Sequence, residues 1–252
     1  MPNPGNAYGY WEPGPAPAPK RGLFTTAEVV DNIDPHLLMG AEYMTNRCTA
    51  GCEWLHLCEP PAGQLKQFMT LNQVRGEPFT AYDALECFPV GVTREEQESR
   101  LRGTFDVKAE AVAEAQLQAI LMASTPIAST SLVDMVADLE EELAANYAGL
   151  GLLHFDRYTA LSVGAAHILR DPEDVDVPAR TINGTPAALG RGYKANANNY
   201  WAGATGRVTI LRGPLVVSSA PPLGDNRERV LVEQTMVILV ECVARFAETV
   251  IP

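Results

Sequence analysis

Residues 230–246 read VLVEQTMVILVECVARF, and from Val230 to Phe246 every second residue is apolar except Gln234, with Ala244 also a weak member of the set. Apart from Gln234, polar side chains stand only at the positions between them. A period of two predicts a β-strand. These 17 residues would span about 55 Å at the rise of a strand, whereas ordinary strands have about five or six residues. The sequence therefore predicts one very long strand at its C-terminal end.

A long helix is predicted from Thr93. The sequence Thr93-Arg94-Glu95-Glu96 fits a capping box, in which Thr93 accepts from the amide of Glu96 and Glu96 reaches back. The pattern ends near residues 124–126, so about 30 residues would form a helix about 45 Å long. Its apolar stripe contains Leu101, Phe105, Val112, Ala113, Leu117, Ile120 and Leu121. A long helix beside a long strand predicts an elongated domain.

Between these two elements the pattern is typical of an α/β unit. Residues 131–147 predict a second helix that Gly149 ends, residues 150–155 predict a buried strand, and Asp156 is the expected N-cap of a third helix from Arg157 to about Ile168. After Pro178, residues 180–189 and 207–211 are predicted to be extended. Helix, strand and helix in short succession favour an α/β lobe.

The N-terminal part has few regular signals. Residues 1–21 contain six prolines and three aromatic residues, so we expect an extended arm that is ordered by lying on a neighbouring subunit. A disordered tail is the alternative. Glycines and prolines interrupt residues 41–79 repeatedly, which predicts a long loop or irregular hairpin that projects and packs on something else.

Composition limits the possible functions. The chain has 252 residues, of which 46% are hydrophobic and 20% charged, as in an ordinary folded protein. The net charge is -12, and Lys20-Arg21 is the one notable basic cluster, so tight nucleic-acid binding over a broad surface is disfavoured. No run of about 18 apolar residues predicts a membrane span, and the N-terminus does not resemble a signal peptide.

Three of the five cysteines lie close together. Cys48, Cys52 and Cys58, with His56, form the spacing C-x3-C-x3-H-x-C, which is not a standard zinc signature. An odd number of cysteines argues against a fully paired disulfide framework. We therefore expect reduced thiols in a protein assembled in the cytoplasm, and zinc binding is the alternative.

The motifs of common enzymes are absent, including G-x-S-x-G, the P-loop and H-E-x-x-H. The glycines at 149–151 and at 190–192 lack the third glycine of a dinucleotide loop. His154 with Asp156 could perform acid–base chemistry, and Ser131 or Ser162 could act as a nucleophile. Because His154 lies within an apolar run and Asp156 at a helix cap, structural roles are favoured. The acidic clusters 95–98 and 138–142 are interpreted as solvated helix faces. No catalytic, cofactor-binding or metal-ligating residue is therefore predicted.

The order of these segments resembles the capsid fold of tailed bacteriophages, the Hong Kong ninety-seven type that encapsulins share. Residues 132–155 followed by Asp156-Arg157-Tyr158 resemble the axial-lobe helix, its buried strand and the next helix. Residues 182–187, INGTPA, resemble the family's apolar-x-G-x-P-apolar strand, and residues 204–210, ATGRVTI, a strand re-entering the peripheral lobe. Residues 225–227 and 230–245 resemble the terminal strand and its Asn-containing turn. Together these stretches extend the resemblance over residues 24–252.

The resemblance implies an α+β phage capsid-type fold. Its expected parts are an N-terminal arm (1–40), an extended loop (41–79), an elongated peripheral lobe with a spine helix (80–123), an α/β axial lobe (124–198) and return strands of the peripheral lobe (199–252). The family's autocatalytic cross-link is not expected, because Lys66 has no identified partner or catalytic Glu.

The resemblance also implies a function. The chain would be a major capsid protein that self-assembles into hexamers and pentamers of an icosahedral head, encloses double-stranded DNA without sequence-specific binding, and is no enzyme. It would be a virion component assembled in the host bacterial cytoplasm, with portal, scaffold or decoration proteins as possible partners. Two alternatives stay open: an encapsulin-like compartment, and a zinc-supported or hydrolytic enzyme using residues near Cys48 to Cys58 or His154.

Overall fold

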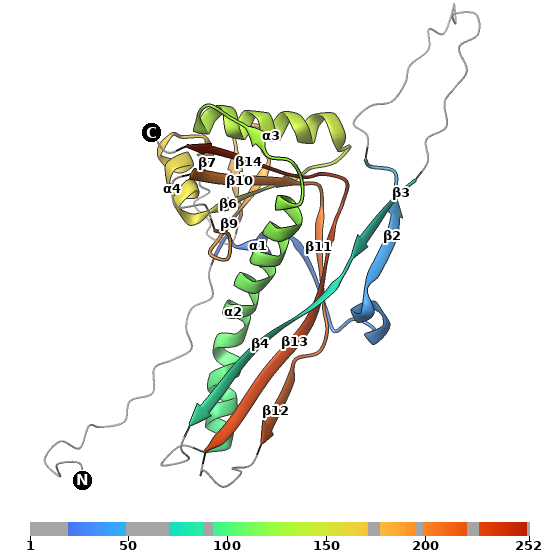
Figure 1. Ribbon diagram of the computed structural model, residues 1–252, viewed down its shortest axis with the longest axis vertical. Helices are drawn as coiled ribbons and strands as arrows, with labels where there is room; N and C mark the ends of the chain where they lie inside the picture. Colours follow the sequence, from blue (N-terminus) through green and yellow to red (C-terminus); the bar gives the residue numbers. More distant parts are fainter. Residues whose placement is uncertain are drawn as a thin grey trace, which may run out of the picture.

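The computed structural model describes residues 20–48, 71–87, 93–170, 177–194, 199–220 and 227–250, and contains two main sheets and a projecting hairpin (Figure 1). Helix α2 (Arg94–Met122) runs along the elongated part of the molecule, beside the first sheet. Helices α3 (Leu132–Asn146) and α4 (Arg157–Ala165) lie with the second sheet at one end of α2. The long helix and the long strand thus lie side by side, as the sequence predicts.

The first sheet is five-stranded and is centred on β13 (Glu228–Val240). Strand β13 is antiparallel to β4 from Glu228↔Cys87 to Val237↔Pro78, and its other edge pairs with β11 and then β12. Leu101, Phe105 and Leu117 of α2 belong to the same core cluster as Val232 and Met236 of β13. The remaining strands of this sheet are β1 (Glu28–Asp31), β4 (Pro78–Cys87), β11 (Val208–Arg212) and β12 (Val216–Ala220).

The second sheet has seven strands in the order β5-β14-β10-β6-β9-β8-β7. Its central strand β6 (Leu152–Asp156) is buried at all five positions, which confirms the predicted buried strand. Met135 and Leu139 of α3 and Val163 of α4 pack against Phe155 and Ala202 in one core. The other strands are β5 (Ile127–Ala128), β7 (Leu169–Arg170), β8 (Ala179–Thr181), β9 (Pro186–Gly190), β10 (Asn199–Thr205) and β14 (Ala244–Val250).

All three predicted helix starts are confirmed. Both hydrogen bonds of the Thr93–Glu96 capping box are present. The Ser131 hydroxyl accepts from the amide of Asp134, and the Asp156 carboxylate accepts from the amides of Tyr158 and Thr159. These side chains satisfy amides that have no partner within the helix.

A short hairpin projects beside the five-stranded sheet (Figure 1). Strands β2 (Ala41–Thr45) and β3 (Asn72–Gly76) pair from Ala41↔Gly76 to Thr45↔Asn72, after the 3-10 helix η1 (Pro35–Met39). The expected extended loop therefore has a hairpin at its base. Residues 49–70 of that loop and residues 1–19 of the expected arm lie outside the described residues.

The prediction of one continuous strand over residues 230–246 is wrong. Strand β13 ends at Val240 and β14 begins at Ala244, in the other sheet. Between them Cys242 has a φ of 64°, and the amide of Glu241 donates to the carbonyl oxygen of Arg207 at 2.9 Å. The left-handed residue turns the chain from one sheet into the other. Strands β10 and β14 thus lie in the seven-stranded sheet, whereas the sequence placed residues 199–252 wholly in the peripheral lobe.

Two further expectations differ from the structure. On α2, Ile120 is 40% exposed, whereas Glu110 and Glu114 are buried. The predicted extended stretch 180–189 is a β8–β9 hairpin, because the chain turns near Asn183 and Gly184 has a φ of 93°. The burial of Glu110 and Glu114 has a structural cause, because both carboxylates accept hydrogen bonds from the N-terminal segment.

Candidate assembly site

The candidate site has two parts, each of which attaches one segment of the chain to the body of the subunit. The first part holds the N-terminal segment against α2. Helix α1 (Leu23–Thr26) begins there, and its first amides point at two buried carboxylates. The Leu23 amide donates to Oε1 of Glu114 at 3.1 Å, and the Phe24 amide donates to Oε1 of Glu110 at 2.9 Å. The carboxylates therefore satisfy amides at the start of α1 that lack helical partners.

The Glu114 carboxylate and the N-terminal segment also contact the chain at the end of β9. The amide of Gly192 donates to Oε2 of Glu114 at 2.7 Å, and the amide of Leu189 donates to the carbonyl oxygen of Arg21 at 2.7 Å. A Cβ at Gly192 would lie 2.1 Å from the carbonyl oxygen of Ala111, so only glycine fits there. Three segments that are distant in sequence thus meet at one point on α2, which we name the arm anchor (residues 21–24, Glu110, Glu114 and 189–192).

Burial determines the electrostatics of the arm anchor. It raises the pKa of both the Glu110 and Glu114 carboxyls above the ordinary value, although the bonds from Phe24, and from Gly192 and Leu23, act in the opposite direction. The sequence gives little sign of this arrangement, because two Glu residues four apart on a helix are usually solvated. The sequence does contain one sign of their burial, namely their position between Phe105 and Leu117 on the apolar side of α2.

The second part of the site lies where β13 passes into β14. The buried Glu241 carboxylate accepts from the hydroxyls of Thr45 and Tyr147, the latter at 2.9 Å, and forms an ion pair with Arg47 at 3.4 Å. The amide of Ala148 also donates to the carbonyl oxygen of Arg47 at 2.8 Å. This inter-sheet junction (residues 45–48, 147–148 and 241–243) connects the hairpin base, the end of α3 and the chain between the two sheets.

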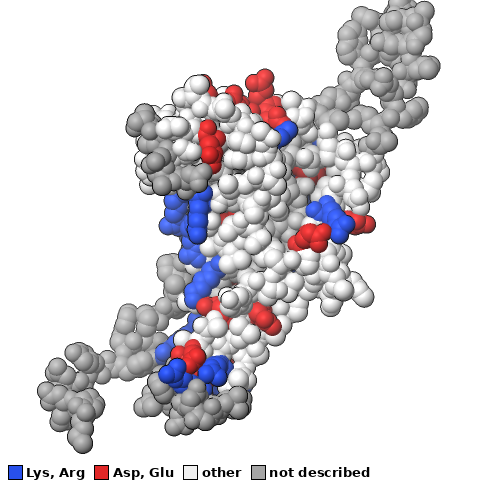
Figure 2. Space-filling model, in the orientation of Figure 1, with Lys and Arg blue, Asp and Glu red and all other residues white. Residues whose placement is uncertain are grey.

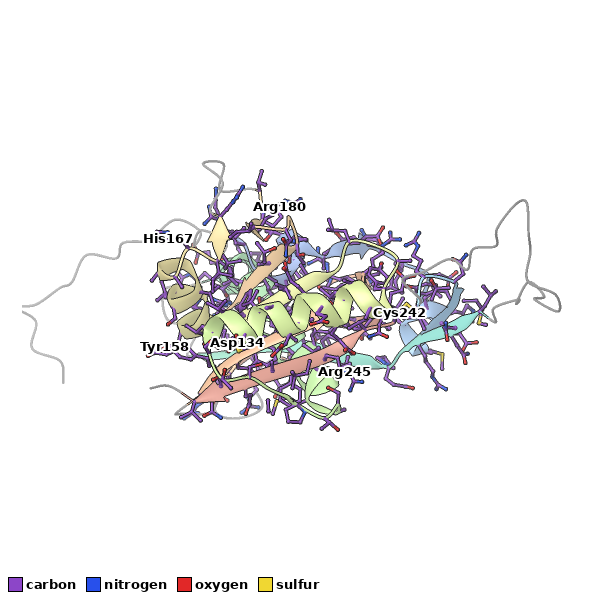
Figure 3. All side chains as sticks on the ribbon, turned by 90° about the horizontal axis from the view of Figure 1, so that it is seen from above. Asp134, Tyr158, His167, Arg180, Cys242 and Arg245 are labelled. Carbon is purple, nitrogen blue, oxygen red and sulfur yellow. A yellow bond between two sulfur atoms is a disulfide. The ribbon has the colours of Figure 1, made fainter. Side chains whose placement is uncertain are left out.

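A disulfide completes the junction and corrects the expectation of reduced thiols. Cys48, directly beyond β2, is bonded to Cys242, and their Cα atoms are 4.9 Å apart. The sequence separation of 194 residues gives no local signal for this pair. Figure 3 shows Cys242 toward the hairpin side of the second sheet, with Tyr158 at the opposite end. Cys52, His56 and Cys58 lie outside the described residues.

The predicted catalytic alternatives have structural partners. His154 is fully buried between the Tyr193 hydroxyl and the Thr205 hydroxyl, each at 2.9 Å, and burial lowers its pKa to about 3. Asp156 and Ser131 cap helices, and the Ser162 hydroxyl donates to the carbonyl oxygen of Tyr158 at 3.2 Å. His154 therefore stays neutral near pH 7, and each group is already engaged within the fold.

The expectation of solvated acidic clusters holds only in part. Glu95 and Glu96 are exposed, but Glu140 accepts hydrogen bonds from Thr181 and Asn183. Within the described ranges, no three His, Cys, Asp or Glu side chains are grouped so that they could hold a metal ion. No helix in the described part of the chain is long and apolar enough to cross a membrane.

Several large apolar side chains are exposed at the ends of the molecule. On the hairpin side Met39 is 81% exposed, and Met44 and Leu71 are more than half exposed. On α4 Leu161 is 76% exposed, and Tyr158 stacks on Tyr200 with ring centroids 5.5 Å apart. Large apolar side chains exposed in this way are candidates for contacts with other subunits, although exposed apolar residues such as Tyr82 and Val250 occur elsewhere on the described surface as well.

Charges form local pairs on much of the surface. Glu86 on β4 accepts from Arg227 and Arg229, and Asp83 accepts from Lys108 of α2. On the face drawn in Figure 2, Lys and Arg gather along one edge, while Asp and Glu are more scattered. The overall excess of acid therefore coexists with a local basic edge.

A comparison with protein-family models gives no match for this chain, and a comparison with curated proteins gives none either. Solved structures match along most of its length. The structure described as "Capsid of native GTA particle computed with C5 symmetry" has a TM-score of 0.60 at 14% identity, covering 96% of this chain and 95% of that chain. A structure from Mycobacterium phage Adephagia has a TM-score of 0.55 at 13% identity, covering 96% and 94%. A virus-like particle from Pyrococcus furiosus has a TM-score of 0.54 at 10% identity, covering 91% and 92%. The chain therefore has the α+β capsid fold of tailed bacteriophages, the Hong Kong ninety-seven type that its segment order predicts.

Proposed function

We propose that this chain is the shell-forming major capsid protein of a tailed bacteriophage, assembling with itself into hexamers and pentamers of an icosahedral head. The observation that carries the proposal is the likeness to a capsid structure over 96% of this chain and 95% of that one. A likeness over 96% of this chain must extend over most of both main sheets. Fold alone does not determine function, so the surfaces of this chain provide the further support.

The exposed apolar side chains support assembly. Met39, Met44 and Leu71 lie on or beside the projecting hairpin. Leu161 lies on α4, which is far from the hairpin in the same chain (Figure 1). Burying such side chains stabilises by about 1.5 to 3 kcal/mol each. Contacts at separate ends of one subunit are those that a closed shell of repeated subunits requires.

The parts of the subunit follow from this proposal. Residues 1–40 would form the arm, 41–79 the extended loop, 80–123 the peripheral lobe with its spine helix, and 124–198 the axial lobe. Of residues 199–252, those of β11, β12 and β13 would return to the peripheral lobe, and those of β10 and β14 would complete the axial sheet. The arm anchor would fix the direction in which the arm leaves α2.

The proposed partners are further copies of the chain and the enclosed double-stranded DNA. A net charge of -12 favours containment of DNA over tight binding, because strong contacts need many neutralised phosphates. Portal, scaffold and decoration proteins are proposed as additional partners. The proposal makes the protein a virion component that assembles in the host bacterial cytoplasm.

An encapsulin-like compartment is the second candidate, and the match to the Pyrococcus furiosus particle favours it. The two candidates share a self-assembling shell and differ in content. A phage head encloses DNA, whereas a compartment encloses protein cargo.

Electron microscopy of the purified full-length protein tests the proposal. Closed particles support a shell, and particles that carry DNA within a phage preparation distinguish a head from a compartment with protein cargo. Met39→Glu should abolish assembly while the subunit stays folded, and Met39→Leu, the matched control, should assemble normally. A small soluble species in place of shells, from the unaltered chain under every assembly condition, would refute the proposal.

A further inference from the structure

We propose that the Cys48–Cys242 disulfide is a redox-controlled cross-link that locks the base of the β2–β3 hairpin onto the junction between the two sheets. Cys48 lies directly beyond β2, and Cys242 is the left-handed residue at which the chain leaves one sheet for the other. The bond therefore joins a projecting element to the turn between the sheets. This inference concerns the single chain and goes beyond its proposed assembly.

Non-covalent contacts hold the two cysteines together when the bond is open. Residues on either side of the pair meet at Glu241, which accepts from Thr45 and Tyr147 and pairs with Arg47. Strand β3 also lies close to β13, since a Cβ on Gly76 would be 2.4 Å from the carbonyl oxygen of Ile238. The thiols are thus positioned before they react, and opening the bond leaves the hairpin docked but less firmly held.

Cys48 and Cys242 are both half-buried and neither lies in the deep core, and thiols that are partly exposed react with small thiols and disulfides more readily than fully buried ones. In a reducing compartment the thiols stay free, and in an oxidising one they pair. The reaction is thiol–disulfide exchange with a low-molecular-weight disulfide such as oxidised glutathione. One thiolate attacks the oxidant, forms a mixed disulfide and releases one glutathione thiol. The second thiolate then attacks the protein sulfur and releases the other. The two protein thiols lose two protons and two electrons in total, and the oxidised glutathione takes up the two protons and the two electrons to give two glutathione thiols.

The cross-link closes a very long loop, because its ends are 194 residues apart. Loops of this length favour a large stabilisation by the bond, and the measured value for a native disulfide is commonly a few kcal/mol. For a chain of this size we expect the melting temperature to fall by roughly 4 to 16 °C when the bond is opened. Hydrogen exchange should become faster in residues 41–48 and 241–243, where the locked segments lie.

The test titrates the purified full-length protein with defined ratios of reduced to oxidised glutathione. Non-reducing peptide mapping measures the fraction of Cys48 joined to Cys242, and the melting temperature and hydrogen exchange are followed in parallel. Cys48→Ser and Cys242→Ser should reproduce the reduced values and be insensitive to the ratio. Cys58→Ser, which removes a thiol and keeps the pair, should behave like the unaltered chain.

Parallel changes in all three measurements support the cross-link. The proposal is overturned if the mapped peptides join Cys48 to a different cysteine, if oxidation leaves the pair free, or if the shift persists in Cys242→Ser. Should a serine variant fail to fold, the glutathione titration of the unaltered chain decides by itself. Shells that form equally well in both redox states would leave the proposed function intact. They would show that the cross-link stabilises the single subunit and does not control assembly.

Discussion

Replacing Glu114 by Ala should loosen the arm anchor and destabilise the subunit. The side chain is fully buried and accepts from the amides of Leu23 and Gly192, at 3.1 and 2.7 Å. An amide left buried without an acceptor costs about 1 to 3 kcal/mol, so two amides cost about 2 to 6 kcal/mol. Removing the buried charge recovers part of that, since burial raises the pKa of this carboxyl. The net loss should be about 2 to 4 kcal/mol.

Equilibrium denaturation measures the loss of stability of the whole subunit, and hydrogen exchange measures the local loss at individual amides. A loss of that size lowers the melting temperature by roughly 4 to 16 °C in a chain of this length. Exchange at the amides of Leu23 and Gly192 should accelerate more than exchange in the core of β13, because the change is local.

The control is Glu141→Ala, which removes an exposed carboxylate of α3 and should change stability by less than about 0.5 kcal/mol. Equal effects of the two substitutions, or unchanged protection of the Leu23 amide in Glu114→Ala, would refute the role assigned to the buried carboxylate. A variant that does not fold at all would exceed the predicted cost, and Glu110→Ala, which frees only the Phe24 amide, then measures the milder change.

Further outcomes are expected for other changes and conditions. Deleting residues 2–21 should leave a folded subunit that forms no stable shells, and heat-stable particles from that deletion would contradict the role of the arm. The added Cβ of Gly103→Ala meets nothing within 4 Å, so this substitution should raise the free energy of unfolding by about 0.5 to 1 kcal/mol. The Cβ of Gly192→Ala would lie 2.1 Å from a backbone oxygen of α2, so this substitution should lower the free energy of unfolding by about 1 to 3 kcal/mol. Denaturant melts measure both changes. Burial raises the folded pKa values of Glu110 and Glu114, so their favourable contribution is complete below the unfolded pKa and is lost as the pH rises through the raised folded values. As the pH is increased above the ordinary carboxyl pKa, the unaltered chain should lose stability relative to the double Gln variant, and a constant difference would argue against this. Isolated subunits should show no DNA binding near 0.15 M salt in gel shifts at several salt concentrations, and micromolar binding with a steep salt slope would contradict containment.

Local chemistry made much of the fold predictable. The start of α2 needed only Thr93 and Glu96, which satisfy each other's amides within one turn. Ser131 and Asp156 acted in the same way for α3 and α4. Because a cap depends on neighbours within a few residues, the local sequence is enough to predict where these helices begin.

The break between β13 and β14 could not be predicted in this way. The alternation of apolar residues continues in the sequence through Cys242, but the buried positions do not follow it: residues 236–239 are all buried, and Glu241 is buried where Val240 and Cys242 are only partly so. The turn depends on partners far away in sequence, namely the carbonyl oxygen of Arg207 for the Glu241 amide and Cys48 for the disulfide. Glu110 and Glu114 were missed for the same reason, since their partners are backbone amides at 23–24 and 192.

The two attachments that the sequence did not reveal lie at places where projecting segments meet the body of the subunit. The arm anchor fixes residues 21–24 to α2 and to the end of β9, and the junction fixes the hairpin base to the turn between the sheets. In the proposed shell a subunit would meet neighbours of different orientation, so segments that leave its body would need to do so at defined angles. Surface ion pairs are weak and could not impose such angles, whereas buried carboxylates with several donors and a covalent bond can. At the arm anchor and at the junction, buried polar groups therefore lie where directional interactions are needed, and the apolar core supplies most of the remaining stability.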